Sequence, residues 1–139
     1  MSFYYSKEII VQQNVSISLR RIHWQKLLSW MARYISQRSS DNPLDELVKC
    51  VLLQVFIKIN SHLQKLALKG KPMNSKSNLK LTPAEKSALQ FIINDEWEEI
   101  AQQTGSEAEQ FFIAYLQPVL DKLHEIEINQ GNSTALTLL

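Results

Sequence analysis

A chain of 139 residues, 45% of them apolar, is long enough to bury a core of ordinary size, and we predict a single domain. Three glycines and four prolines are too few for the frequent turns of an all-β chain, and the single cysteine, Cys50, excludes an intrachain disulfide. The net charge of +1 conceals an asymmetry, because residues 1–80 hold 13 Lys/Arg and 4 Asp/Glu whereas residues 81–139 hold 2 and 10.

The N-terminal sequence MSFYYSKEIIVQQ lacks the basic segment, apolar run and small-residue cleavage site of a signal peptide. No uncharged apolar stretch approaches the roughly 18 residues of a membrane span. We therefore expect a cytoplasmic protein that does not contact membranes. In that reducing compartment Cys50, which lies inside an apolar helical pattern, is expected to be a core residue.

The first long helix is predicted over about residues 15–37, after an N-terminal arm at 1–14. Its apolar stripe follows the three- and four-residue spacing of one helical face. Val15, Ile17 and Leu19 alternate with serines as in a strand, but the sequence suggests no partner strand. We therefore expect an irregular arm or a short helix there. The stripe consists of Ile17, Trp24, Leu27, Leu28, Met31, Tyr34 and Ile35.

The second helix gives the clearest pattern in the chain. Asn42 supplies an N-cap and Pro43 a first-turn proline, and apolar residues then keep the helical repeat to about Leu68. Leu53 and Ile57 add apolar surface on a second flank, which favours a central helix with more than one neighbour.

Residues 69–81 are predicted to be a flexible basic connection, since they combine glycine, proline, asparagines and serines with four lysines. A capping box, Thr82–Glu85 with Pro83 at the first helical position, then opens a third helix that passes through Ile100. Gly105 is its expected stop.

The fourth helix should begin at Ser106, because Glu109 completes the spacing of another capping box. Pro118 is expected to kink or split it near Ala114–Gln117. A mobile tail is predicted at 130–139. The predicted fold is thus all-α, with four principal helices in a bundle.

No catalytic, cofactor or metal constellation is evident, and we predict a protein that is not an enzyme. There is no Gly-x-Ser-x-Gly motif and no glycine-rich phosphate loop. Asp121 with His124 is a single metal-ligand pair, which is more often a surface pair than a site. The glutamates around Trp97 are interpreted as a solvated helix face.

The segment LTPAEKSALQFI at 81–92, followed by EEIAQQTG at 98–105, resembles the opening of a LuxR-type helix-turn-helix domain. In that family the next helix reads the DNA major groove and begins with basic or amide residues. Here the next segment is SEAEQFFIAYLQP, acidic and then apolar, and Phe111 and Phe112 are expected to be core residues. The resemblance therefore assigns no DNA-reading residue to this chain.

A candidate partner surface lies in the basic half. At 100° per residue, Lys26, Trp30 and Arg33 fall on one side of the first helix, away from its apolar stripe, so Trp30 is a candidate for a position outside the core. The alternative is that Leu19, Ile22 and Trp30 form a second packing face. The candidate surface for a protein partner or nucleic acid consists of Arg20, Arg21, Lys26, Trp30, Arg33, Lys69, Lys71, Lys76 and Lys80.

Two functional hypotheses follow. The first is a small helical interaction module, acting as an adaptor, regulator or subunit through an apolar and basic helix surface, with a protein partner or a second copy of the chain. It rests on more apolar helix surface than one core requires. The second is a nucleic-acid-binding regulator that uses the basic half, unless the acidic half neutralises those cations within the fold.

Overall fold

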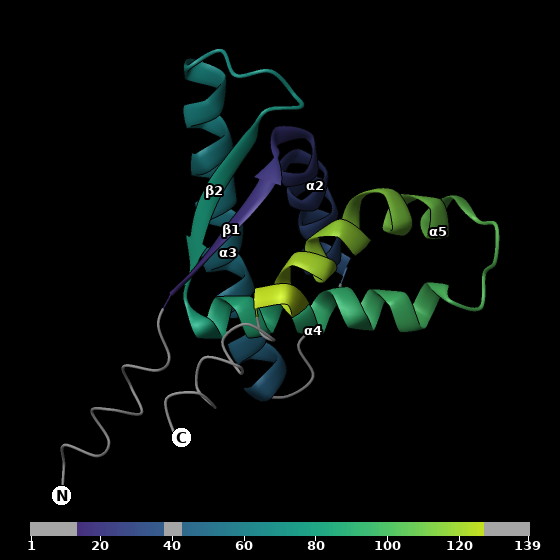
Figure 1. Ribbon diagram of the computed structural model, residues 1–139. Coiled ribbons are helices and arrows are strands. Elements are labelled where there is room, and N and C mark those ends of the chain that lie inside the picture. The colour runs from purple at the N-terminus through teal and green to yellow at the C-terminus, as the bar shows by residue number, and fades with distance from the viewer. Residues whose placement is uncertain (1–13, 38–42, 127–139) are drawn as a thin grey trace, which may run out of the picture.

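The computed structural model describes residues 14–37 and 43–126, which form helices around a short antiparallel sheet (Figure 1). The prediction of a mostly helical chain is confirmed, the strict all-α class is wrong, and a regular bundle stays a prediction. The predicted tail, the Asn42 cap and residues 1–13 of the arm lie outside the described residues. The elements are β1 (Val15–Arg20), α2 (Arg21–Gln37), α3 (Pro43–Leu68), β2 (Lys76–Leu81), α4 (Pro83–Ile100), α5 (Glu107–Phe111) and a π-helical turn, η1 (Phe112–Leu116).

Strands β1 and β2 replace the beginning of the predicted first helix and the end of the predicted flexible connection. They pair in register, with Val15 opposite Leu81 and Ile17 opposite Leu79. Both segments alternate, so one face of the pair carries its apolar side chains into the core while Lys76, Asn78 and Lys80 face outward. The strand pattern of β1 therefore does have a partner, more than fifty residues further along the chain.

Helix α2 begins directly where β1 ends, at Arg21 instead of Val15. The connection after α3 supplies the acceptors that the first turn of α2 needs. The backbone N–H of Arg21 donates to the carbonyl of Ser75, and that of Ile22 donates to the carbonyl of Met73, both at 2.9 Å. The end of this connection, at Met73 and Ser75, is thus joined to the first turn of α2 by backbone hydrogen bonds, and its flexibility stays a prediction.

Helix α3 has the bounds that the sequence predicts, from Pro43 to Leu68. Its first turn carries Asp45 and Glu46 and its last turn Lys65, so both ends complement the helix dipole. In Figure 1, α3 runs beside the sheet, and α4 crosses α3 near the N-terminal half of α3.

The capping box of α4 is present and is joined to α3. Thr82 Oγ1 accepts from the N–H of Glu85 at 3.2 Å, and Glu85 Oε1 accepts from the N–H of Thr82 at 2.8 Å. Lys58 of α3 donates to the same Glu85 oxygen at 2.5 Å. Burial raises the pKa of Glu85, but the hydrogen bonds from Lys58 and Thr82 outweigh it and hold the pKa below its ordinary value. Helix α4 ends at Ile100, five residues before the expected Gly105.

The fourth helical segment is interrupted before Pro118, as predicted. Ser106 caps α5 by accepting from Glu109 at 3.1 Å, and η1 follows, in which the N–H of Gln117 donates to the carbonyl of Phe112. Residues 117–126 then continue as α-helix. Pro118 has no N–H for the carbonyl of Ala114, and the backbone of Ala114 instead hydrogen-bonds the imidazole of His23 from α2.

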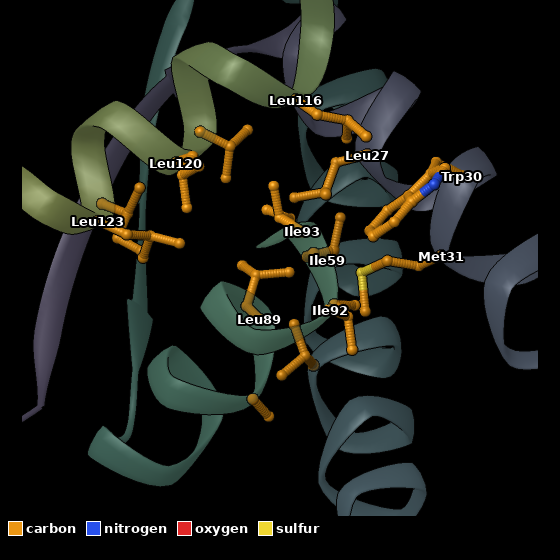
Figure 2. Packing of buried hydrophobic residues seen from close by; sticks show 14 of the residues in the cluster. Leu27, Trp30, Met31, Ile59, Leu89, Ile92, Ile93, Leu116, Leu120 and Leu123 are labelled. Atoms are coloured by element: carbon orange, nitrogen blue, oxygen red, sulfur yellow. The ribbon is translucent and has the colours of Figure 1, made fainter. Parts of the chain in front are cut away.

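The hydrophobic core is formed by buried side chains from both strands, from α2, α3, α4 and η1, and from residues 117–126 (Figure 2). Trp24 of α2 is fully buried, its ring meets His62 of α3 edge-on with 5.7 Å between centroids, and its Nε1 lies 3.4 Å from the carbonyl of Ser77 in β2. Phe112 is buried as expected, and Phe111 packs at the edge of the cluster. The central residues in Figure 2 are Leu27, Met31, Ile59, Leu89, Ile92, Ile93, Leu116, Leu120 and Leu123.

Candidate functional site

The residues of the predicted partner surface separate into three places. Arg20, Arg21, Lys69, Lys71 and Lys76 lie together where the loop after α3 meets the adjoining ends of the two strands. Lys80 lies on the outward face of β2, opposite Ser16. Lys26, Trp30 and Arg33 lie on α2 where it packs against the C-terminal half of the chain. The nine residues do not form one continuous surface.

The first group, with Lys65 of α3, makes a cationic end of the molecule. Arg20 is the register partner of Lys76, and the Arg21 guanidinium donates to the carbonyl of Lys71. Gly70 turns the chain there with a φ of 65°, a conformation that favours glycine. Within the described residues, no carboxylate forms an ion pair with any of these cations. The basic end is defined as Arg20, Arg21, Lys65, Lys69, Lys71 and Lys76.

The cations of the basic end lower the pKa of two neighbouring histidines. Burial lowers the pKa of His62, and the charges of Lys65 and Lys69 lower it further. Burial also lowers the pKa of His23, with a second contribution from Arg20, against the opposing hydrogen bond to Ala114. His62 Nε2 lies 2.7 Å from Ser77 Oγ, so this ring also fixes α3 to β2.

The cations of the α2 group lie over aromatic rings of the C-terminal half, with Lys26 half-buried and Arg33 exposed. Lys26 Nζ lies 5.3 Å from the centroid of the Tyr115 ring, and the Arg33 guanidinium lies 5.8 Å from that of Phe111. Trp30 between them is only 4% exposed, so its predicted position outside the core is wrong. Trp30 and Leu19 are both buried, as the alternative of a second packing face requires, but Leu19 lies on β1. The segment after α4 folds back over this side of α2.

That folding also creates an open pocket of about 760 Å³ between α2, α4 and α5, which the sequence does not predict. The Tyr34 hydroxyl donates to Asp95 at 2.9 Å beside it, and the rings of Trp30 and Tyr34 are 5.4 Å apart. Glu96 and Glu99, interpreted from sequence as part of a solvated face, both line this open space, and Glu99 is exposed. The acidic pocket is lined by Trp30, Arg33, Tyr34, Gln37, Glu96, Glu99, Glu107, Ala108, Phe111 and Leu116.

The outward side of α3 is the other notable surface. Leu53 and Ile57, which the sequence places on a second flank, are 46% and 62% exposed. Leu47 is 61% exposed, and Cys50 is exposed too, so its predicted core position is wrong. At 100° per residue, Cys50, Leu53 and Ile57 lie within 60° of one another and opposite the buried side of the helix. These four residues are the α3 outer face.

Metal-ligand clusters and membrane-spanning helices are both absent from the described part of the chain. No group of three or more His, Cys, Asp or Glu side chains in residues 14–37 and 43–126 is arranged to hold a metal ion. The carboxylate of Asp121 accepts from the amide of Gln117 at 2.9 Å, and His124 is exposed. No helix within those residues is long and apolar enough to cross a membrane.

Comparison with known proteins adds no functional information. No family model, no curated protein and no solved structure matches this chain. The functional proposals therefore rest on the α3 outer face and the basic end.

Proposed function

We propose that the chain is a helical protein–protein interaction module and that the α3 outer face is its interface. The observation that carries this proposal is the row of exposed Leu47, Cys50, Leu53 and Ile57 along one helix. Exposed apolar side chains aligned on one face mark association sites more often than scattered ones do. Such a row is the sort of surplus apolar surface that an adaptor, regulator or subunit presents to a partner helix.

The chemistry around the row supports an interface. From Val51 to Gln64 the only formally charged residue is Lys58, and its ammonium group is bound to Glu85 within the molecule. The outward positions between the apolar residues carry uncharged amide and hydroxyl groups, among them Gln54 and Ser61. Depletion of charge at the centre, with polar groups around it, is the usual composition of an interface core.

A second copy of the chain is the occupant that the charges of α3 favour. The helix begins with acidic Glu46 exposed and ends with basic Lys65 exposed. In an antiparallel pair whose two-fold axis passes near Val55, Leu53 of each copy faces Ile57 of the other. The same axis brings Glu46 close to the other copy's Lys65 at both ends. This is a self-complementary interface of the kind that closes a two-fold dimer.

Light scattering on a sizing column tests the proposal. The wild-type chain is expected to elute with about twice the chain mass of 16.1 kDa at micromolar concentration. Leu53→Glu with Ile57→Glu should yield a folded monomer, because four carboxylates would meet at the centre of the pair. Phe91→Glu, on α4 and 61% exposed, is the matched control and should leave the dimer intact. A wild-type monomer, or a dimer that survives the double substitution, would contradict the proposal.

Polyanion binding by the basic end is the second candidate function. Six cations without a carboxylate partner in the described residues favour it, and in Figure 1 the basic end lies far from the loop that joins the glutamate-bearing end of α4 to α5. The aromatic platform expected at Trp30 is buried, so base stacking there does not contribute. Contacts of this kind are with phosphates and have little sequence preference.

Fluorescence anisotropy with a labelled single-stranded oligonucleotide at two salt concentrations tests this second function. Arg20→Gln with Lys76→Gln should weaken binding about tenfold at low salt and reduce the salt dependence, since two phosphate contacts are removed. Lys122→Gln, an exposed cation on residues 117–126, is the control and should change little. Equal weakening by both variants would show binding to general charge and would count against the basic end.

A further inference from the structure

Two exposed aliphatic side chains lie among the charges of the basic end. Leu68, in the last turn of α3, is 88% exposed, which makes it the most exposed large apolar side chain of the described residues. Met73, in the loop after α3, is 40% exposed. Along the chain these two residues lie among Lys65, Lys69, Lys71 and Lys76. The basic end therefore presents apolar surface together with positive charge.

Backbone hydrogen bonds fold this loop back against both of the helices that it adjoins. The N–H groups of Gly70 and Lys71 donate to carbonyls of the last turn of α3, both at 3.0 Å, which is the pairing of a Schellman motif. Further along, the carbonyl of Met73 accepts from the N–H of Ile22 in the first turn of α2. Figure 1 shows the loop at the top end of the molecule, beside the C-terminal end of α3. The aliphatic and cationic side chains are thus presented at the same end.

The chain segments that form this end contain no carboxylate side chain. Residues 14–37 and 47–84, which include β1, α2, the loop, β2 and most of α3, hold no Asp or Glu. Residues 65–81 also hold no aromatic residue, although surfaces that bind single-stranded nucleic acid use aromatic rings to stack bases. Aliphatic side chains surrounded by cations suit a bilayer better, because it offers anionic headgroups over a hydrocarbon interior.

We propose that the basic end docks on a bilayer surface that carries anionic lipids. The inference rests on polyanion binding by the basic end, the second function proposed above, and names the bilayer as the polyanion. Leu68 and Met73 enter the interfacial region while the cations contact the headgroups. Both contributions are needed, because a single weak anchor gives only marginal, reversible attachment. Docking of this kind needs neither a membrane-spanning helix nor a leader segment, the two features whose absence led us to expect no membrane contact from the sequence.

Flotation of the full chain with lipid vesicles tests the docking. The probes are vesicles of phosphatidylcholine alone and vesicles that also contain about 30% phosphatidylserine. The chain should float with the anionic vesicles only, and raising the salt concentration should release part of it. Arg20→Gln with Lys76→Gln should weaken binding to the anionic vesicles about 25-fold, since each cation near such a surface contributes about fivefold.

The apolar side chains distinguish a bilayer from other polyanions. Leu68→Gln with Met73→Gln should weaken binding to anionic vesicles about tenfold, because apolar surface is no longer transferred out of water. The same variant should bind the single-stranded oligonucleotide within about twofold of the wild-type affinity, since no phosphate contact is removed. Phe91→Gln with Ile113→Gln, at positions 61% and 55% exposed on α4 and η1, is the matched control and should leave both affinities unchanged.

The outcomes separate this inference from the function on which it rests. Oligonucleotide binding without vesicle binding would overturn the docking and leave polyanion binding in place, whereas the absence of both would contradict polyanion binding as well. Equal vesicle binding by the apolar variant and its control would also overturn the docking. Leu68 lies about three turns beyond Ile57 on the same side of α3, so light scattering should show the wild-type mass for the apolar variant. A lower mass would assign Leu68 to the α3 interface and overturn its role here.

Discussion

Replacing Lys58 by Met should lower the free energy of unfolding by about 2–3 kcal/mol at pH 7. Glu85 is 1% exposed, and without Lys58 its carboxylate keeps only the Thr82 contacts of the capping box. The Lys58 side chain is 38% exposed, so the figure is placed below the full cost of breaking a buried pair. Urea unfolding monitored by circular dichroism measures the loss.

The same substitution has a distinct pH dependence. In the wild-type chain the lowered pKa of Glu85 contributes stability above the ordinary value of 4.5, and this contribution is lost as the pH falls through the folded-state pKa. Without Lys58, burial raises that pKa, so Glu85 can bind a proton and the deficit of the variant narrows in acid. Lys122→Met, which removes an exposed partner 3.6 Å from Glu125, should cost less than about 0.5 kcal/mol at any pH. A Lys58 variant as stable as this control would show that the pair contributes nothing.

Replacing Trp24 by Ala should cost about 3–5 kcal/mol, the largest loss expected for a single position here. The ring is fully buried and joins α2 to His62 of α3 and to the Ser77 carbonyl of β2. The cavity therefore opens where three elements meet, and little of the surrounding structure can collapse into it. Urea unfolding at pH 7.5, where His62 is neutral, is the measurement.

Trp97 is the natural control for that experiment. It is 39% exposed and contacts Phe112 at 5.0 Å between centroids, so Trp97→Ala removes a comparable ring with far less buried surface. We expect a loss of about 1–1.5 kcal/mol for this variant. Equal losses at the two tryptophans would contradict the position of Trp24 at the junction of α2, α3 and β2.

Local signals predicted most of the helical structure. The repeat of α3 and the capping box at Thr82 fix their helices because caps and periodicity act within a few residues. Pro118 predicted the interruption for the same reason, although the sequence did not show that it takes the form of the π-helical turn η1. The β1 pattern was visible but was not interpreted as a strand, because its partner β2 lies far along the chain in a lysine-rich segment.

The candidate surfaces were harder to predict, because a helical projection gives the direction of a side chain and not what packs on it. It grouped Lys26, Trp30 and Arg33 correctly, but the segment after α4 covers that side of α2. Cys50 was assigned to the core from the apolar sequence around it, although it faces away from the buried side of α3. Leu53 and Ile57 were recognised because their surplus over one helical stripe is a local property.

Disulfide trapping through the single cysteine tests the α3 interface most directly. In the antiparallel pair Cys50 faces residue 60 of the other copy, whereas the two Cys50 residues are about 15 Å apart along the helix axes. Mild oxidation of Asn60→Cys should therefore produce a covalent dimer, while the wild-type chain and Ser87→Cys on the exposed side of α4 should remain unlinked. Failure of the Asn60 variant to cross-link, or equal cross-linking of the Ser87 variant, would contradict α3 as the interface.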